Sequence, residues 1–367
     1  MLPNVDLLFG LLLAVIVLTS LARQLRIAYP ILLVLGGLVL SFIPGVPSIT
    51  LPPNLVLVLF LPPLLYWESL NISYRDLRSS LRPILRLTIG LVLVTIVAVA
   101  VVAHHLISGF TWPMAFLLGA ILGPTDEVGV AAIAERLPLP SRLLTIIEGE
   151  SLLNDAVSLV IYSAALAAVV SGSISLPDAG IQVVMAGLGG VAVGLIVGWG
   201  VRWFRRWLDN PLTENTISLL TGFAAYLPAN ALHLSGVLAV VACGIYLARQ
   251  RPRAMSPRTR LQNVEMWQVV DFLLNGVLFI LIGLQLHGIL GKLASYRPST
   301  LVLHPLVIIL TVVLFRIAWV FGFSCLPRLV VPARKRTQPE ESWQESSIVA
   351  WSGMRGGVSL AAALARP

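Results

Sequence analysis

Residues 143–161 read LLTIIEGESLLNDAVSLVI, an apolar stretch that is interrupted in its middle by polar and charged residues. The Leu, Ile and Val residues on both sides are typical of a helix that crosses a membrane. A charged side chain in such a helix costs at least about 2.5–3.5 kcal/mol, so intramembrane charges usually have a functional role. This stretch therefore predicts a membrane protein with a polar site inside one of its helices.

The spacing of the polar residues places them on neighbouring faces of one helix. Ser151 and Asp155 are four residues apart, as are Glu150 and Asn154, and residues four apart share a helix face. Glu148 extends the first of these two stripes. One Ser or Asn alone would indicate a polar contact between helices, but this density of carboxylates favours a binding site. A buried carboxylate such as Asp155 can hold a proton or a monovalent cation, and this competition permits cation/proton exchange.

The composition of the whole chain is that of a polytopic, all-α membrane protein. Its 367 residues are 57% hydrophobic and 11% charged, whereas about a quarter of the residues of a soluble domain are charged. We expect about twelve transmembrane helices, of which the eighth and ninth are separated only around His233. The twelve apolar segments run over residues 5–22, 28–46, 53–70, 83–106, 112–134, 143–171, 180–202, 215–232, 234–248, 268–288, 301–327 and 345–366.

The basic residues alternate between the two ends of these segments. Loops after even-numbered segments carry only Lys292 and Arg297, while loops after odd-numbered segments carry most of the arginines. By the positive-inside rule, the N-terminus is expected outside and the basic loops in the cytoplasm of a multi-pass protein of the cell membrane. The net charge of +8 therefore indicates topology, and no nucleic-acid partner is expected. Residues 249–267 are expected to form the longest connecting loop.

Two apolar segments contain sequences that break helices. Residues 123–127 read GPTDE in the fifth segment, and residues 352–357 read SGMRGG in the twelfth. Such breaks are tolerated at membrane depth only inside protein or beside a polar cavity. The two segments run in opposite directions by the predicted topology, and similar phrases, GVAA at 129–132 and GVSLAA at 357–362, follow the breaks. Two opposed broken helices indicate inverted repeats with a site near the membrane midplane.

The breaks carry charged residues of their own. Thr125 and Asp126 could simply cap a half-helix, but a carboxylate at this depth favours a site. Arg355 needs an anionic partner at the second break, and we expect that partner to be Glu150.

Three further features are open to more than one interpretation. Arg316 lies in the middle of the eleventh segment and has no predicted partner. Glu68 lies near the cytoplasmic end of the third segment, where a solvated helix end and a role in a cavity are equally compatible. Gly190, Gly194 and Gly198 are spaced by four, which indicates close helix packing but does not by itself indicate a dimer.

Taken together, these motifs resemble the NhaP-type sodium/proton exchangers of the monovalent cation:proton antiporter family. The resemblance implies thirteen helices in two inverted repeats, with the ion site where two broken helices cross. It also implies core helices at about 83–171 and 301–367 and dimerisation helices at about 5–70 and 180–288. Because the chain ends after the twelfth segment, the last helix of that fold is expected to be missing. The most specific matches are residues 123–126, 148–155, 275–285 and 353–360.

The resemblance also assigns roles to individual residues. It implies that Asp155 binds the cation and the proton, with Asp126 as its partner. It further implies that Thr125 supplies a backbone oxygen and Ser151 a hydroxyl.

The remaining implied roles are structural. Asn154 would be held by Glu150, which in turn would pair with Arg355. The Asn-Asp pair implies electroneutral exchange of one proton for one cation, which could be Na⁺, K⁺ or Li⁺. A homodimer within the lipid bilayer is expected, without a cofactor and without enzymatic activity.

Three alternatives remain open from the sequence. They are a cation channel, a non-transporting remnant and an intramembrane hydrolase. The last is suggested by Gly149-Glu150-Ser151, which begins like a Gly-x-Ser nucleophile turn. However, Leu153 replaces the second glycine of that motif, and no histidine lies mid-span in a neighbouring segment to act as a base.

Overall fold

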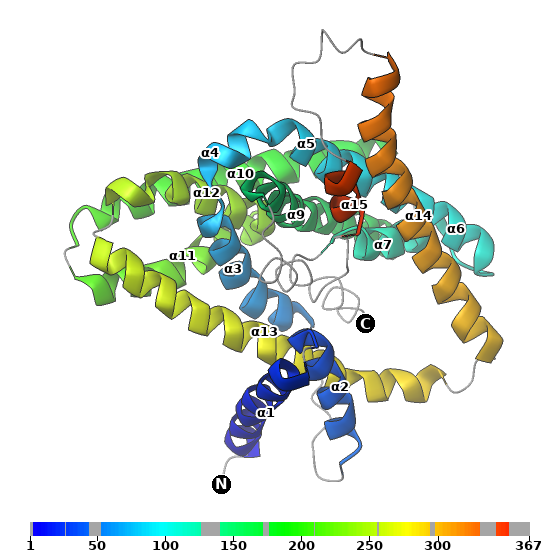
Figure 1. The fold of residues 1–367 in the computed structure, drawn as a ribbon, viewed down its shortest axis with the longest axis horizontal. Coiled ribbons are helices and arrows are strands. Elements are labelled where there is room, and N and C mark those ends of the chain that lie inside the picture. Colours follow the sequence, from blue (N-terminus) through cyan, green and yellow to red (C-terminus); the bar gives the residue numbers. More distant parts are fainter. Residues whose placement is uncertain are drawn as a thin grey trace.

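The computed structural model describes residues 3–25, 27–43, 53–125, 140–171, 176–208, 210–254, 257–293, 298–330 and 343–351. Within these ranges the chain is almost entirely helical, and it contains no strand (Figure 1). The predicted all-α fold is therefore confirmed. The elements are α1 (Pro3–Leu25), α2 (Tyr29–Ser41), α3 (Pro53–Asn71), α4 (Tyr74–Ser79), α5 (Leu81–Leu85), the π-helix η1 (Arg86–Leu91), α6 (Val92–Leu106), α7 (Trp112–Leu122), α9 (Ser141–Ser171), α10 (Leu176–Arg205), α11 (Pro211–Ala231), α12 (Gly236–Ala254), α13 (Pro257–Leu293), α14 (Pro298–Val330) and α15 (Trp343–Trp351).

Each of the twelve predicted segments contains one or more of these helices. The predicted separation around His233 is confirmed, because this residue lies in the turn between α11 and α12 and adopts a left-handed φ of 56°. The expected loop at 249–267 is wrong, since α12 continues to Ala254 and α13 already begins at Pro257. The Arg and Gln residues of this stretch are good helix formers, and proline is well tolerated at the first position of a helix.

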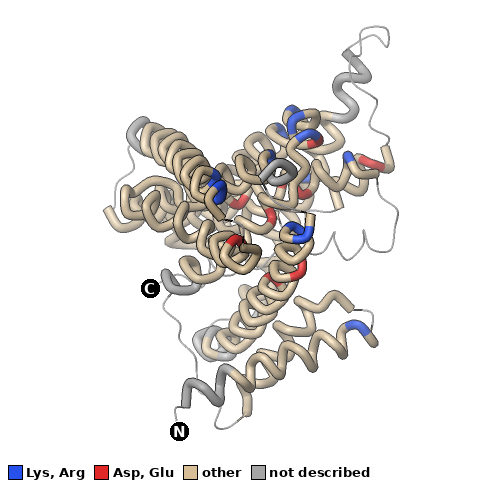
Figure 2. The backbone as a smooth tube through the Cα atoms, turned by 90° about the vertical axis from the view of Figure 1, so that its left-hand side faces the viewer, with Lys and Arg blue, Asp and Glu red and all other residues tan. Residues whose placement is uncertain are grey.

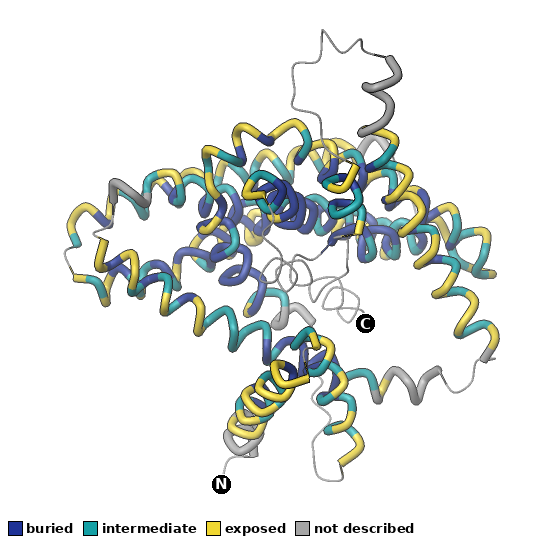
Figure 3. Tube along the Cα trace, in the orientation of Figure 1, coloured by how far each residue is buried: buried dark blue, intermediate teal, exposed yellow. Residues whose placement is uncertain are grey.

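The outer surface of the bundle is apolar, as a membrane requires. Among the described residues, five helical stretches are long and apolar enough to cross a membrane, and four shorter helices are also apolar. Large side chains are exposed along them, such as Val170 at 82% and Leu188 at 66%. Exposed positions follow α1 and α14 in Figure 3, and charged positions are few along the tube in Figure 2. Such helices are stable where hydrocarbon surrounds them.

The helices pack in two groups that share α9. In the first group, α10, α11 and α12 pack on one another, α11 and α12 also pack on α3, and α13 packs on α2 and α1. In the second group, α6 packs on α7 and α14, and α14 packs on α15. Helix α9 contacts members of both groups and carries a long row of buried residues through the centre of the molecule (Figures 1 and 3).

The glycine stripe of α10 lies against α12 of the same chain. A methyl group added to Gly190 would overlap the carbonyl oxygen of Ser235, and one added to Gly194 would overlap that of Ala239. The predicted close packing is therefore confirmed. The glycines allow the two helix backbones to approach each other within one chain.

Candidate ion-binding site

The predicted break in the fifth segment is present in the structure. Helix α7 ends at Leu122, and Gly123, Pro124 and Thr125 are not helical. Proline has no N–H to donate, which disfavours continuation of the helix at this point. Residues 126–139 lie outside the described residues, so the structure does not place Asp126.

The polar face of α9 packs against this break through Thr125. The Ser151 hydroxyl donates to the Thr125 carbonyl oxygen at 2.9 Å, and Asn154 Nδ2 donates to Thr125 Oγ1 at 2.6 Å. Thr125 Oγ1 in turn donates to Glu150 Oε1 at 3.3 Å. We call these four residues the Thr125 cluster, and all four are buried. A hydroxyl can donate one hydrogen bond and accept others, so Thr125 links both polar stripes of α9 to the break.

Asp155 lies next to this cluster, four residues after Ser151 on the same stripe. Its side chain is 8% exposed. Two further oxygens, Asn154 Oδ1 and Ser158 Oγ, are buried nearby. Neither has a hydrogen-bond partner among the described residues. A methyl group on Gly123 would lie 3.0 Å from Ser158 Oγ, so Ser158 faces the break. Buried oxygens of this kind are usually satisfied by a partner, and the oxygen set suits a hard monovalent cation.

Sequence reasoning did not select Ser158, although its spacing could have identified it. It lies seven residues after Ser151 and three after Asp155, which places it on the same stripe. Its immediate neighbours in the sequence are apolar, so Ser158 does not stand out as part of the polar run.

Arg316 binds the other side of Glu150. Arg316 Nη1 donates to Glu150 Oε1 at 2.6 Å, and Nη2 donates to Oε2 at 3.1 Å. Nη2 also donates to the Val349 carbonyl at 2.9 Å, and Nε donates to that of Ala350 at 3.2 Å. These two carbonyls belong to α15. Arg316 therefore joins α9, α14 and α15.

The sequence predicts Arg355 as the partner of Glu150 and leaves Arg316 without a predicted partner. Arg355 lies outside the described residues, so that pair stays a prediction. The structure shows Arg316 in a bidentate pair with Glu150. Both are charged residues in the middle of long apolar segments. This shared membrane depth is the sequence feature that could have indicated their pairing. Residues 352–357, which form the second predicted break, lie outside the described residues.

Two other predicted residues lie apart from the Thr125 cluster. Glu148 is exposed although Ser151 and Asp155 on its stripe are buried, and it lies two turns nearer the beginning of α9 than Asp155. Glu68 is half-buried on α3. Their roles remain predictions.

The family of the chain follows from its sequence as a whole. The family model described as "Sodium/hydrogen exchanger, transmembrane" matches residues 11–367. The chain therefore belongs to the sodium/hydrogen exchanger transmembrane family.

Individual relatives agree with this assignment. The uncharacterized Na(+)/H(+) exchanger Rv2287 of Mycobacterium tuberculosis is 40% identical over 359 residues, which is 96% of this chain and 65% of the relative. The Na(+)/H(+) antiporter ApNhaP of Aphanothece halophytica is 35% identical over 345 residues, covering 93% of this chain and 63% of the relative. The chain thus spans a little less than two thirds of the length of these relatives.

A solved structure shows the same fold. The sodium proton antiporter MjNhaP1 from Methanocaldococcus jannaschii superposes with a TM-score of 0.77 at 21% sequence identity. The match covers 98% of this chain and 87% of that chain. The predicted antiporter fold is confirmed by this likeness.

Proposed function

We propose that the protein exchanges a monovalent cation for a proton across the cell membrane, with Asp155 as the group that binds one or the other. The observation that carries this proposal is a buried carboxylate in the middle of a long apolar helix, beside a break in a second helix. A charge at this position is costly unless it has a function. Because one carboxylate cannot hold a proton and a cation equally well at once, the binding of either releases the other.

The names of relatives support the same class of substrate. The relative from Aphanothece halophytica is named a Na(+)/H(+) antiporter. A Bacillus subtilis relative, 32% identical over 351 residues and matched over 52% of its length, is named a sodium, potassium, lithium and rubidium/H(+) antiporter. We therefore propose Na⁺ as a substrate, with K⁺ and Li⁺ as further candidates.

The cation would be bound by oxygen atoms from both helices. We propose the carboxylates of Asp155 and Asp126, the hydroxyl of Ser151 and the backbone carbonyl of Thr125 as ligands, and we add the hydroxyl of Ser158. A carbonyl oxygen has two lone pairs, so the Thr125 oxygen can accept from Ser151 and still face a cation. Oxygen ligands of this kind suit hard cations.

The exchange is proposed to be electroneutral. Asn154 is neutral, and the charge of Glu150 is balanced by Arg316. Among the described residues of the site, Asp155 thus carries the charge that a proton or a cation would neutralise. One proton would replace one cation.

Movement of the site between the two sides of the membrane would involve the two helix groups. We propose that helices within about 83–171 and 301–367 form a core unit, because α7, α9, α14 and α15 all meet around Thr125 and Arg316. Helices within about 5–70 and 180–288 would form the dimerisation unit of a homodimer. Rocking of one unit against the other would expose a site near the midplane alternately.

The central test is cation-driven proton flux in proteoliposomes that contain a pH-sensitive dye. An outward Na⁺ gradient should acidify the lumen, because each Na⁺ that leaves is exchanged for a proton that enters. Asp155→Asn should reduce this flux to that of protein-free vesicles. Asp271→Asn is a matched control, because Asp271 is a mid-helix carboxylate of α13 that accepts a hydrogen bond from Asn275 at 3.0 Å. Undiminished flux in Asp155→Asn would overturn the proposal, and an ohmic Na⁺ current would indicate a channel.

The hydrolase alternative receives no support from the geometry of Ser151. Its hydroxyl donates to the backbone carbonyl of Thr125, which cannot act as a general base.

A further inference from the structure

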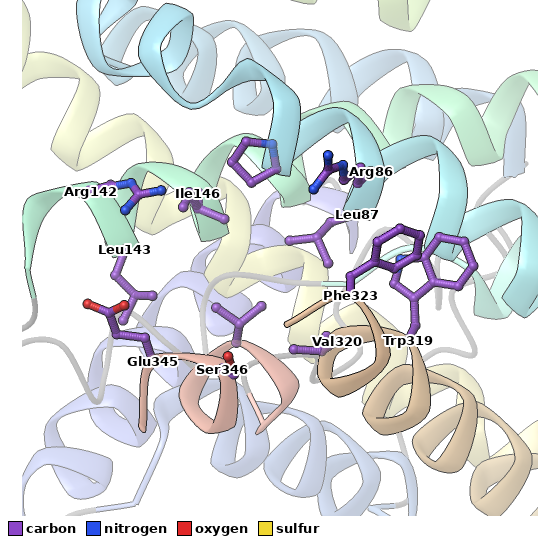
Figure 4. A pocket seen from close by; sticks show the side chains of 12 residues that line it. Arg86, Leu87, Arg142, Leu143, Ile146, Trp319, Val320, Phe323, Glu345 and Ser346 are labelled. Atoms are coloured by element: carbon purple, nitrogen blue, oxygen red, sulfur yellow. The ribbon is translucent and has the colours of Figure 1, made fainter. Parts of the chain in front are cut away.

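A pocket with charged and apolar walls lies one turn before Glu150 on α9 and one turn after Arg316 on α14. Its volume is about 80 Å³, and it is formed by residues of α5, η1, α9, α14 and α15 (Figure 4). Leu87, Val320 and Val349 supply apolar surface. Figure 4 shows Arg86 and Arg142 along one side of the pocket, with Glu345 on the opposite side. The proposed ion exchange uses none of these side chains.

The charged residues of the pocket lie near ends of helices that the predicted topology places at the cytoplasmic surface. Arg86 and Arg142 lie near the beginnings of the fourth and sixth apolar segments, and each of these segments follows a cytoplasmic loop. Phe323 lies near the end of the eleventh segment, and Glu345 lies at the beginning of the twelfth. The pocket is therefore at the depth of the headgroups of the inner leaflet, where basic residues meet lipid phosphates.

The outer edge of the pocket continues into surface that faces lipid. Leu85, Ile89 and Phe323 are exposed by 43%, 45% and 41%. The guanidinium of Arg86, which is exposed, lies 5.7 Å from the centroid of the Phe323 ring. Positive charge and apolar surface are thus adjacent at the mouth of the pocket. This arrangement complements a phospholipid, whose negatively charged phosphate is adjacent to apolar acyl chains.

We propose that the pocket binds the headgroup of an inner-leaflet phospholipid, with its phosphate held between Arg86 and Arg142. Guanidinium groups bind phosphate oxygens in a bidentate manner. One water needs about 10–15 Å³ of comparable volume, so 80 Å³ admits a group of about five heavy atoms such as a phosphate. The acyl chains would lie outside, over Leu85, Ile89 and Phe323.

Glu345 restricts which headgroups fit. Its carboxylate repels a second negative charge in the pocket and attracts a positive one. A phosphodiester with a single negative charge, or one that also carries an amine, is therefore favoured over a doubly charged phosphate monoester.

An occupant of the pocket would pack against the helices that Arg316 joins. Val349 lines the pocket, and its carbonyl accepts a hydrogen bond from Arg316. Ile146, another lining residue, lies one turn before Glu150 on α9. A bound headgroup would thus stabilise the junction of α9, α14 and α15, because a ligand that binds only the folded state raises its stability.

The test is the thermal unfolding midpoint of the purified chain in lipid-free detergent, with and without added phospholipid. Phosphatidylethanolamine or phosphatidylglycerol should raise the midpoint by a few degrees, whereas glycerol phosphate and oleate should not. Arg86→Gln combined with Arg142→Gln should lose this shift. Arg206→Gln, which removes an exposed arginine near the end of α10, should keep it.

A second variant separates loss of binding from loss of folding. Val320→Trp fills the pocket and leaves both arginines in place, so it should also lose the lipid-induced shift. Its midpoint without lipid, compared with that of the unmodified chain, shows whether the variant is folded. A shift that survives in both pocket variants would overturn the proposal. A shift produced by glycerol phosphate alone would also overturn it, because it would indicate a site for a soluble anion. The measurement needs no ion gradient, so its outcome is independent of whether Asp155 exchanges cations.

Discussion

Arg316 and Glu150 are separated by 166 positions in the sequence, and their side chains form a bidentate ion pair with N–O distances of 2.6 and 3.1 Å. Arg316 also donates to the carbonyls of Val349 and Ala350 on α15. Exposure is 5% for Arg316 and 1% for Glu150, so neither charge has bulk water as an alternative partner. The pair therefore joins three helices next to the Thr125 cluster, of which Glu150 is a member.

Removal of Arg316 should destabilise the protein strongly. Arg316→Gln leaves the Glu150 carboxylate buried without its counter-charge, and loss of one partner of a buried pair costs about 3–5 kcal/mol. The free energy of unfolding in detergent should fall by an amount in this range. The free energy of unfolding of Arg316→Lys should lie between those of the unmodified protein and Arg316→Gln, because lysine keeps the charge but loses the bidentate geometry.

The double variant Glu150→Gln, Arg316→Gln provides the control for this prediction. If the pair is coupled, the double variant should be more stable than the sum of the two single losses indicates. Simple additivity would contradict a direct ion pair as the source of the effect.

The hydroxyl of Thr125 should be more important than its methyl group. Thr125→Val preserves shape but removes the acceptor for Asn154 and the donor for Glu150. Because Asn154 precedes Asp155, we expect the KM for Na⁺ to rise severalfold, with a smaller change in the maximal rate. Thr125→Ser keeps the hydroxyl and should remain close to the unmodified protein. Equal KM values for the Val and Ser variants would show that these hydrogen bonds do not position the site.

The apolar segments and the break at Gly123 could be predicted from the sequence because each depends on local composition. Membrane helices need long apolar stretches, and a Gly-Pro pair interrupts a helix whatever its tertiary contacts are. The pairing of Glu150 with Arg316 could not be predicted in this way, because it depends on how α14 packs on α6 and α15. Ser158 was missed because a lone Ser among apolar residues looks like an ordinary helix position. The helical structure within 249–267 does not follow from the sequence, because a run of basic residues is also typical of a cytoplasmic loop.

Gly194 and Gly200 on α10 should respond in opposite ways to alanine. A methyl group at Gly194 meets the backbone of Ala239, which cannot move aside, so Gly194→Ala should separate α10 from α12 and cost about 1–3 kcal/mol. Nothing lies within 4 Å of a methyl group at Gly200, so Gly200→Ala should stabilise the helix by up to about 1 kcal/mol. Unfolding of the two variants in parallel checks both values. A larger loss at Gly200 than at Gly194 would contradict the packing of α10 against α12.

Ser158 should contribute to cation affinity although it is absent from the motif. If its hydroxyl is a ligand, Ser158→Ala removes one polar contact to a charged group, worth about 1.5–3 kcal/mol, and the KM for Na⁺ should rise by about tenfold or more. Ser163→Ala is the matched control, because the Ser163 hydroxyl on the same helix donates to the Val160 carbonyl at 2.8 Å. Identical KM values for the two variants would remove Ser158 from the site.

Exchange through Asp155 should not depend on the membrane potential. One proton moving against one monovalent cation carries no net charge, whereas one net charge per cycle would couple to a potential of 100 mV with about 2.3 kcal/mol. Proteoliposomes held at zero and at −100 mV by a gradient of the permeant anion thiocyanate, with choline as its counter-ion and no K⁺, should therefore show the same Na⁺-driven proton flux. Asn154→Asp adds a second carboxylate beside Asp155 that can bring a second proton, so any flux that remains in this variant should change with the potential. A potential-dependent flux in the unmodified protein would show that a further group takes part in each cycle.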